Sequence, residues 1–380
     1  MFKEGDVRIP SGCAISGIMN TKGIAFSGEK IIQSISLMHD RSNGLGGGFA
    51  GYGIYPHFKD YYAFHLFFDN FSAKENTEMY LRQHYHVEFD EAIPTRITSS
   101  ITDPPIIWRY FVKPKAERLI KSGVVDEEEF IVRSVMNVNR MIEGAYVFSS
   151  GKNMGTFKGV GYPEEIGNFF RLEEYKGYIW TAHGRFPTNT PGWWGGAHPF
   201  TLLDWSVVHN GEISSYDANR RFLQMHGYTC TLQTDTEAII YIFDLLARRF
   251  RVPLEVAVAV VAAPFWSEIQ RMDQEKKELY TALRAVYGSL LINGPFSIIL
   301  ASNNGIMALN DRLKLRPLTV ATKNEFLFIA SEEAAIREVC PMPDRVWAPR
   351  GGKPVFGLLE SAFHSRDVLW QQPLAAGYSS

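Results

Sequence analysis

Short apolar runs alternate with amphipathic and glycine-rich stretches along this chain, and the pattern predicts a mixed α+β protein. Runs that begin at Cys13, Tyr178 and Trp205 have the length and composition of buried strands. Further strands are expected at 296–301, 305–309, 317–322 and 326–330. Helices are expected where apolar residues recur every three or four positions, near 31–38, 214–226, 236–250 and 254–288.

The segment 60–150 has a different pattern of apolar and polar residues, which predicts a separate structural unit. Its apolar runs and polar helical stretches follow one another as strand, helix, strand, strand, helix and strand. This is the element order of a ferredoxin-like fold. His84 and His86 would alternate on one face of its second strand, but without a third ligand nearby a structural or surface role is favoured over a metal site.

A glycine-rich stretch follows the first expected helix. Gly46, Gly48 and Gly51 match the G-x-G-x-x-G spacing of dinucleotide-binding loops. That motif lies between a strand and a helix, whereas here a helix precedes it and a strand-like run, 52–55, follows it. These glycines are therefore expected to let the backbone pass close to a ligand or to another strand.

Composition and charge exclude several classes of protein. The 380 residues are 46% hydrophobic and carry a net charge of −2, which favours neither a nucleic acid nor an anionic membrane as partner. No apolar run is long enough to cross a membrane, and the N-terminus lacks the apolar core of a secretory signal. Three widely separated cysteines exclude an Fe–S cluster or a cysteine-rich zinc site within the chain and predict a cytoplasmic location.

Three motifs between Thr181 and Glu237 carry candidate chemistry. They are 184–189 (GRFPTN), 209–212 (HNGE) after an apolar strand, and 234–237 (TDTE) at the start of a helix. Together they supply a cation, an amide beside a glycine, and an acid, all at the ends of expected strands or helices. Such a set suits a small molecule that carries both a positive and a negative charge.

Cys13 is the candidate nucleophile, and it has two interpretations. A cysteine at the start of a core strand commonly serves as a small hydrophobic residue. Alternatively, cleavage of the Gly12–Cys13 bond would make Cys13 the N-terminal residue. Its α-amine, with a reference pKa of about 7.7–8.0, could then act as the base for the thiol on the same residue.

The other motifs also have ordinary structural alternatives. Arg185 could form a structural salt bridge, the 209–211 segment could be a hairpin turn, and Asp235 could cap a helix N-terminus. Asp311 and Arg316 could likewise be structural, and we leave them out of the candidate catalytic set.

The ordered set of motifs resembles the class II glutamine amidotransferases, whose nucleophile is an N-terminal cysteine. The likeness is greatest to the glutaminase portion of glutamate synthase. It rests on Cys13 before its strand, the motif 183–190 (HGRFPTNT), the 193–199 loop, the motif 209–213 (HNGEI), the turn with Asp235, and the segment 311–318 (DRLKLRPL). These pieces cover most of the chain outside 60–150.

The resemblance implies a role for each matching residue. Cys13 would attack the side-chain amide of L-glutamine and form a thioester. Asn210, through its side chain, and Gly211, through its backbone N–H, would form the oxyanion hole. Arg185, supported by Thr188, would bind the substrate α-carboxylate, and Asp235 its α-ammonium group.

The resemblance also implies an architecture. The fold would be an Ntn-hydrolase αββα sandwich with an inserted ferredoxin-like α+β subdomain. Residues 1–12 would form a leader removed autocatalytically to expose Cys13. The glutaminase domain would comprise 13–59 and 151–357, the insert 60–150, and an irregular tail 358–380. Trp193 and Trp194 are candidates for a mobile lid over glutamine.

The implied function is a glutaminase subunit that passes ammonia to a separate synthase subunit, as in a split glutamate synthase. No cofactor or metal is expected in this chain, and flavin and Fe–S groups are expected only on partner subunits. Two alternatives remain open: a non-catalytic glutamine-sensing or scaffold subunit, and an amidohydrolase of the same fold class that acts on another amide.

Overall fold

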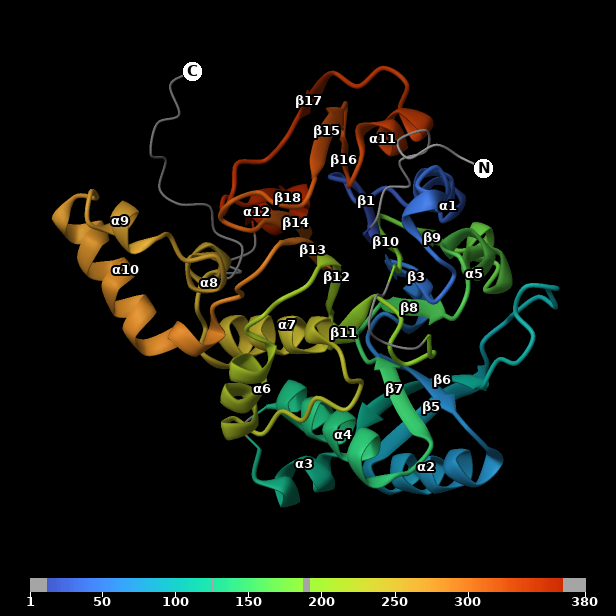
Figure 1. The fold of residues 1–380 in the computed structure, drawn as a ribbon. Coiled ribbons are helices and arrows are strands. Elements are labelled where there is room, and N and C mark those ends of the chain that lie inside the picture. Colours follow the sequence, from blue (N-terminus) through green and yellow to red (C-terminus); the bar gives the residue numbers. More distant parts are fainter. Residues whose placement is uncertain (1–11, 125, 187–191, 365–380) are drawn as a thin grey trace, which may run out of the picture.

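Two antiparallel β-sheets packed face to face form the centre of the molecule (Figure 1). The computed structural model describes residues 12–124, 126–186 and 192–364. The larger sheet has the strand order β17 (Arg345–Trp347), β15 (Thr319–Lys323), β16 (Phe326–Ala330), β1 (Ala14–Asn20), β10 (Ile179–Gly184), β3 (Gly47–Tyr52) and β8 (Met154–Gly159). The smaller has the order β11 (Phe200–Leu202), β12 (Trp205–Gly211), β13 (Phe296–Ser302), β14 (Gly305–Asn310) and β18 (Val355–Leu358).

The two sheets meet through a layer of aliphatic side chains because their strands alternate inward and outward residues. Ile15 and Met19 of β1 face Ile299 of β13 and Ile306 of β14 in this layer. Polar contacts also cross it, as where the Tyr52 hydroxyl donates to Ser206 Oγ at 2.6 Å and contacts the Ala301 carbonyl oxygen at 2.9 Å.

Helices cover both outer faces, so the fold is the expected αββα sandwich. On the larger sheet lie α1 (Glu29–Ser36), α5 (Pro163–Phe169) and α11 (Glu333–Val339). On the smaller sheet α7 (Asp235–Phe243) packs against β11 and β12 and continues as a π-helix over Asp244–Arg249. Beyond it lie α6 (Tyr216–Met225), α8 (Leu254–Val261), α9 (Trp266–Ile269) and α10 (Gln274–Tyr287).

The expected insert forms a third, four-stranded antiparallel sheet of order β5-β6-β4-β7. Its elements are β4 (Tyr62–Phe68), α2 (Phe71–His84), β5 (Tyr85–Ala92), β6 (Ile106–Pro114), α3 (Ala116–Ser122), α4 (Glu127–Met141) and β7 (Ala145–Ser149). With α3 set aside, this is the predicted ferredoxin-like element order. The domain boundaries themselves stay a prediction, because apolar residues of this unit are continuous with the core beneath α7.

This unit lies across one edge of the sandwich (Figure 1). Thr201 Oγ1 on β11 donates to the Phe148 carbonyl oxygen at 2.6 Å, which ties the unit to the smaller sheet. His65 on β4 contacts the Thr156 carbonyl oxygen of β8 at 2.9 Å, which ties it to the larger one. A single unit therefore covers the edge strands of both sheets.

Several local predictions are wrong. The strand expected at 52–55 lies earlier, as β3, because the glycines themselves pair with β10 and β8. An added Cβ at Gly48 would lie 2.2 Å from the His198 carbonyl oxygen, so the close backbone approach expected of this stretch is confirmed. The 254–288 helix is broken into α8, α9 and α10.

Two further corrections concern His84 and the C-terminal tail. His84 ends α2 instead of starting a strand, since its ring stacks on Tyr80 and contacts the Tyr80 carbonyl oxygen one turn earlier. It therefore does not alternate with His86. The tail is not irregular from 358 onward, because Leu358 still pairs with β14 and α12 spans Glu360–His364. Within the part of the chain that the structure describes, no helix has the length and apolarity required to cross a membrane.

Candidate active site

Four chain segments bring the candidate residues to one end of the sandwich. Cys13 immediately precedes β1, and because Ala14 pairs with Gly184, the neighbouring strand delivers Arg185 beside it. Asn210 and Gly211 end β12, and Asp235 begins α7. A cavity of about 380 Å³ lies among these ends, and Cys13, Arg185, Gly211 and Asp235 all line it.

Cys13 is held from both sides. The Phe186 backbone N–H donates to its Sγ at 3.3 Å, and the Arg41 guanidinium donates to its carbonyl oxygen at 3.4 Å through both Nε and Nη2. Arg41 is oriented in turn by a 2.9 Å ion pair with Glu332. Burial raises the pKa of the Cys13 thiol, although the Phe186 N–H and the Arg185 charge oppose that rise. The thiol therefore needs a base to become a nucleophile near neutral pH.

Asn210 and Gly211 border a second, smaller cavity that Cys13 also lines. Its volume is about 100 Å³, and it is also lined by Gly12 and Arg316. The Asn210 side chain is fully buried, and neither its Nδ2 nor its Oδ1 has a hydrogen-bond partner among the described residues. Burying an amide without hydrogen-bond partners costs folding free energy. Its position beside the Cys13 thiol suits a role in binding the substrate group that the thiol attacks.

Gly211 is required by its surroundings. Its φ of +148° is one that side chains rarely adopt, and an added Cβ would lie 2.0 Å from the Pro295 carbonyl oxygen. The alternative of a hairpin turn at 209–211 is wrong, because all three residues belong to β12.

Asp235 provides a fixed anion at the far side of the larger cavity. Its Oδ2 accepts from the Ile213 N–H at 3.2 Å, and its Oδ1 accepts from the Thr236 hydroxyl at 3.2 Å. Burial by itself raises the pKa of this carboxyl, but His209 and these hydrogen bonds outweigh burial and lower it. Thr234, and not Asp235, is the N-cap of α7. The carboxylate of Asp235 therefore remains available to a ligand.

Two buried histidines, His198 and His209, contact the Thr236 hydroxyl, and a third, His183, stacks on His198. The sequence predicted none of these contacts. His198 Nε2 lies 2.7 Å and His209 Nδ1 3.1 Å from Thr236 Oγ1. The hydroxyl has one proton, which goes to Asp235, so it accepts from both rings. His183 Nε2 contacts the His209 carbonyl oxygen at 2.9 Å, and its ring stacks on that of His198 at 4.0 Å.

This arrangement assigns the histidine tautomers. His183 and His198 each donate through Nε2, and their Nδ1 atoms have no hydrogen-bond partner among the described residues, so these two nitrogens are bare lone pairs. Burial lowers the pKa of His183 to about 3 and that of His198 well below its ordinary value. The neutral ring of His198 therefore donates to the Thr236 hydroxyl, which in turn donates to the Asp235 carboxylate. Their sequence signal was the recurrence of His in three of the motifs.

Lys158 and Glu237 are two further buried groups behind the site. Lys158 Nζ donates to the carbonyl oxygens of Gly195 at 3.0 Å and Ala197 at 2.9 Å, and burial lowers its pKa to about 7. Glu237 accepts from the backbone N–H groups of Thr231 and Leu232, and burial raises its pKa to about 7. Each group fixes a loop that leads into the cavity.

The structure thus brings five of the six predicted site residues together, and the sixth, Thr188, lies outside the described residues. Of the pair left out, Asp311 is structural, since its carboxylate accepts from three backbone N–H groups. Arg316 instead borders the small cavity at Cys13. Trp193 and Trp194 line a different cavity, so the expected lid residues do not face Cys13 in this structure.

Comparison with known proteins identifies the family to which this chain belongs. The family model described as "Glutamine amidotransferases class-II" matches residues 73–343. An uncharacterized protein of Archaeoglobus fulgidus is 51% identical over 352 residues, 92% of this chain and 93% of that protein. A putative glutamine amidotransferase of Methanothermobacter thermautotrophicus is 30% identical over 202 residues, 52% of this chain and 57% of its own length.

More distant similarities cover smaller parts of longer proteins. The glutamate synthase [NADPH] large chain of Bacillus subtilis is 26% identical over 215 residues, which are 50% of this chain and 14% of that protein. Among solved structures, the glutamine phosphoribosylpyrophosphate amidotransferase of B. subtilis aligns with a TM-score of 0.43 at 13% identity, over 90% of this chain and 47% of that one. The family match spans most of the chain, and this protein belongs to the class II glutamine amidotransferases.

Proposed function

We propose that this protein is a glutaminase that hydrolyses L-glutamine to L-glutamate and ammonia through a thioester on Cys13. The observation that supports this most directly is the placement of a thiol, a guanidinium and a carboxylate around one cavity. Arg185 would bind the α-carboxylate of glutamine, with Thr188 in support, and Asp235 its α-ammonium group. The side-chain amide would then lie at Cys13.

The proposed reaction begins with a proton transfer. After removal of the leader, the free α-amine of Cys13 takes the thiol proton, and Sγ attacks the amide carbon. Asn210 Nδ2–H and the Gly211 N–H stabilise the oxyanion that develops. The amine then protonates the leaving nitrogen, ammonia departs, and a water molecule hydrolyses the thioester to glutamate.

The position of Gly12 supports a need for cleavage before catalysis. Gly12 has a φ of +122°, and an added Cβ would lie 3.0 Å from Arg316 Nη1 and 3.5 Å from Asn210 Oδ1. Gly12 therefore forms part of the wall of the small cavity into which the substrate oxyanion would point. Removing the leader would both free the α-amine and open this cavity on the side of Gly12.

The released ammonia would pass to a synthase on another polypeptide, and any flavin or Fe–S chemistry would belong to that partner. The similarity to the glutamate synthase large chain motivates this part of the proposal, since this chain spans 14% of that protein. A split glutamate synthase is the form of assembly that we favour.

The test combines intact-mass analysis, N-terminal sequencing and a glutaminase assay on the purified protein. We expect a chain that begins at Cys13 and releases glutamate from glutamine, and we expect Cys13→Ala to abolish release. Cys340→Ala is the matched thiol control, because Cys340 lies outside both cavities at Cys13. A chain that starts at Cys13, binds glutamine and releases no glutamate would favour the sensor alternative.

The second alternative, an amidohydrolase for another amide, is tested with Arg185→Lys. A lysine keeps the charge but loses the two-pronged geometry that suits a carboxylate. Selective loss of glutamine turnover would support recognition of an amino acid. Unchanged glutamine turnover in this variant would argue for a different substrate.

A further inference from the structure

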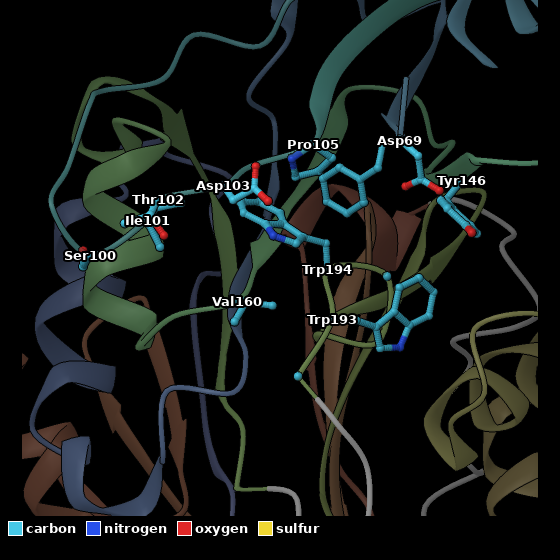
Figure 2. Close-up of a pocket in the computed structure, with 13 residues that line it drawn as sticks. Asp69, Ser100, Ile101, Thr102, Asp103, Pro105, Tyr146, Val160, Trp193 and Trp194 are labelled. Atoms are coloured by element: carbon cyan, nitrogen blue, oxygen red, sulfur yellow. The ribbon is translucent and has the colours of Figure 1, made fainter. Parts of the chain in front are cut away.

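A third cavity lies between the four-stranded unit and the loop at Trp193, away from Cys13. Its volume is about 420 Å³, and the residues that line it share no member with the cavity at Cys13. Figure 2 shows that its walls come from the end of β4, the segment 100–105, the start of β7 and the Trp193 loop. Concave sites of this size bind small molecules in many proteins.

Aromatic rings form much of its wall, and they are held in place by packing. The Trp194 indole meets Phe67 edge to face at 5.5 Å, and the Trp193 indole meets Tyr146 in the same way at 5.5 Å. The Trp194 ring lies on Gly159, where an added Cβ would be 2.5 Å away, and the Trp193 ring lies on Gly195, where it would be 2.2 Å away. These rings are therefore preformed and leave open faces to a ligand.

The charges at this cavity are of one sign. Asp69 and Asp103 line it, and none of its lining residues is a lysine, an arginine or a histidine. Among the described residues neither carboxylate has an ion pair. In Figure 2 Asp103 lies on the side of Trp194 and Asp69 on the side of Tyr146, so the two anions flank the aromatic wall.

A buried lysine, Lys158, contacts the backbone of the loop that carries the two tryptophans. Lys158 Nζ is bonded to the carbonyl oxygens of Gly195 and Ala197, and burial lowers its pKa. Its donors thus point at the loop backbone and leave the two carboxylates to a ligand. Aromatic faces and carboxylates both attract organic cations.

We propose that this cavity is a binding site for a small organic ammonium compound with an apolar body. The apolar part would lie against Trp193 and Trp194, and the ammonium group would lie near Asp69 or Asp103. The site is independent of glutamine turnover, because it contains none of the residues assigned to that reaction.

The experiment uses the full-length protein and two probes of nearly equal shape. Binding of 3-phenylpropylamine, which is protonated at pH 7, is measured by ligand-observed NMR at low salt against the neutral 3-phenylpropan-1-ol. We expect the amine to bind about tenfold more tightly than the alcohol. Equal affinity, or binding of neither probe, would overturn the proposal.

Variants then locate the charge preference. Asp69→Asn and Asp103→Asn should each weaken amine binding about threefold to tenfold and leave alcohol binding unchanged. Asp60→Asn is the matched control, because Asp60 is exposed and lies outside the cavity. If Asp60→Asn weakened amine binding as much as the other two substitutions, the attraction would be a general surface effect and the site would be refuted.

Discussion

The Thr236 hydroxyl offers the sharpest test of how the site is built, through the substitution Thr236→Val. Valine keeps the shape of threonine and replaces the hydroxyl with a methyl group. That hydroxyl joins Asp235 Oδ1 at 3.2 Å, His198 Nε2 at 2.7 Å and His209 Nδ1 at 3.1 Å. The substitution therefore removes three contacts among groups that are largely buried.

The expected loss follows from the groups left without partners. His198 Nε2–H loses its acceptor in a fully desolvated position, at a cost of about 1–3 kcal/mol. His209 keeps a 3.7 Å approach to Asp235, and Asp235 keeps the Ile213 N–H, so these two losses are smaller. The free energy of unfolding should fall by about 2–4 kcal/mol in total. The KM for glutamine should rise because Asp235 is less firmly oriented.

The matched control is Thr236→Ser, which retains the hydroxyl. Urea unfolding of the three proteins, followed by circular dichroism, measures the stability difference, and a glutaminase assay measures KM and kcat. Serine should lie within about 1 kcal/mol of wild type. A valine variant as stable as wild type and with the same KM would refute both the tautomer assignment and the role given to the hydroxyl.

The remaining predictions concern the oxyanion hole, the backbone and the pH dependence of stability. Asn210→Ala should lower kcat about 10²–10³-fold with little change in thermal stability, since the amide has no hydrogen-bond partner among the described residues. An unchanged kcat would remove Asn210 from the mechanism. Gly48→Ala should lower the melting temperature by several degrees in a thermal scan, because its Cβ would meet the His198 carbonyl oxygen at 2.2 Å, and an unshifted transition would contradict that close approach. The folded-state pKa of Glu237, about 7, exceeds its ordinary value of 4.5, so the folded protein binds more protons between these values and stability should fall as pH rises through that window. Glu237→Gln should flatten this slope in urea titrations at pH 5, 6 and 7, and an unaltered slope would assign it to another group.

The sequence predicted the site better than it predicted the elements around it. The sequence identified Cys13, Arg185 and Asp235 because each is a reactive or charged residue at the end of a strongly apolar run. Functional side chains often lie at such positions. The strand β3 could not be placed, because its pattern is dominated by glycines whose purpose is contact with β10, β8 and the 198 loop. Such contacts join residues far apart in the chain.

Long-range contacts also explain what was missed at the site. Arg41 and Arg316 lie far from Cys13 in sequence, and each could have been an ordinary surface arginine; the fold brings them to the carbonyl of Cys13 and to the small cavity. The tail was expected to be irregular from 358 onward, but Leu358 still belongs to β18, which pairs with the edge of β14. Trp193 and Trp194 were predicted to form a lid because they lie in a loop. In the structure their rings pack on Gly195 and Gly159, respectively.

The position of the four-stranded unit limits how this protein can be shortened. It covers β8 of one sheet and β11 of the other, through contacts such as those of His65 and Thr201. Deleting residues 60–150 would expose the outer backbone edges of both strands, and an exposed strand edge is a template for intermolecular pairing. We therefore predict that a truncated chain self-associates and that the inserted unit helps to keep the sandwich soluble.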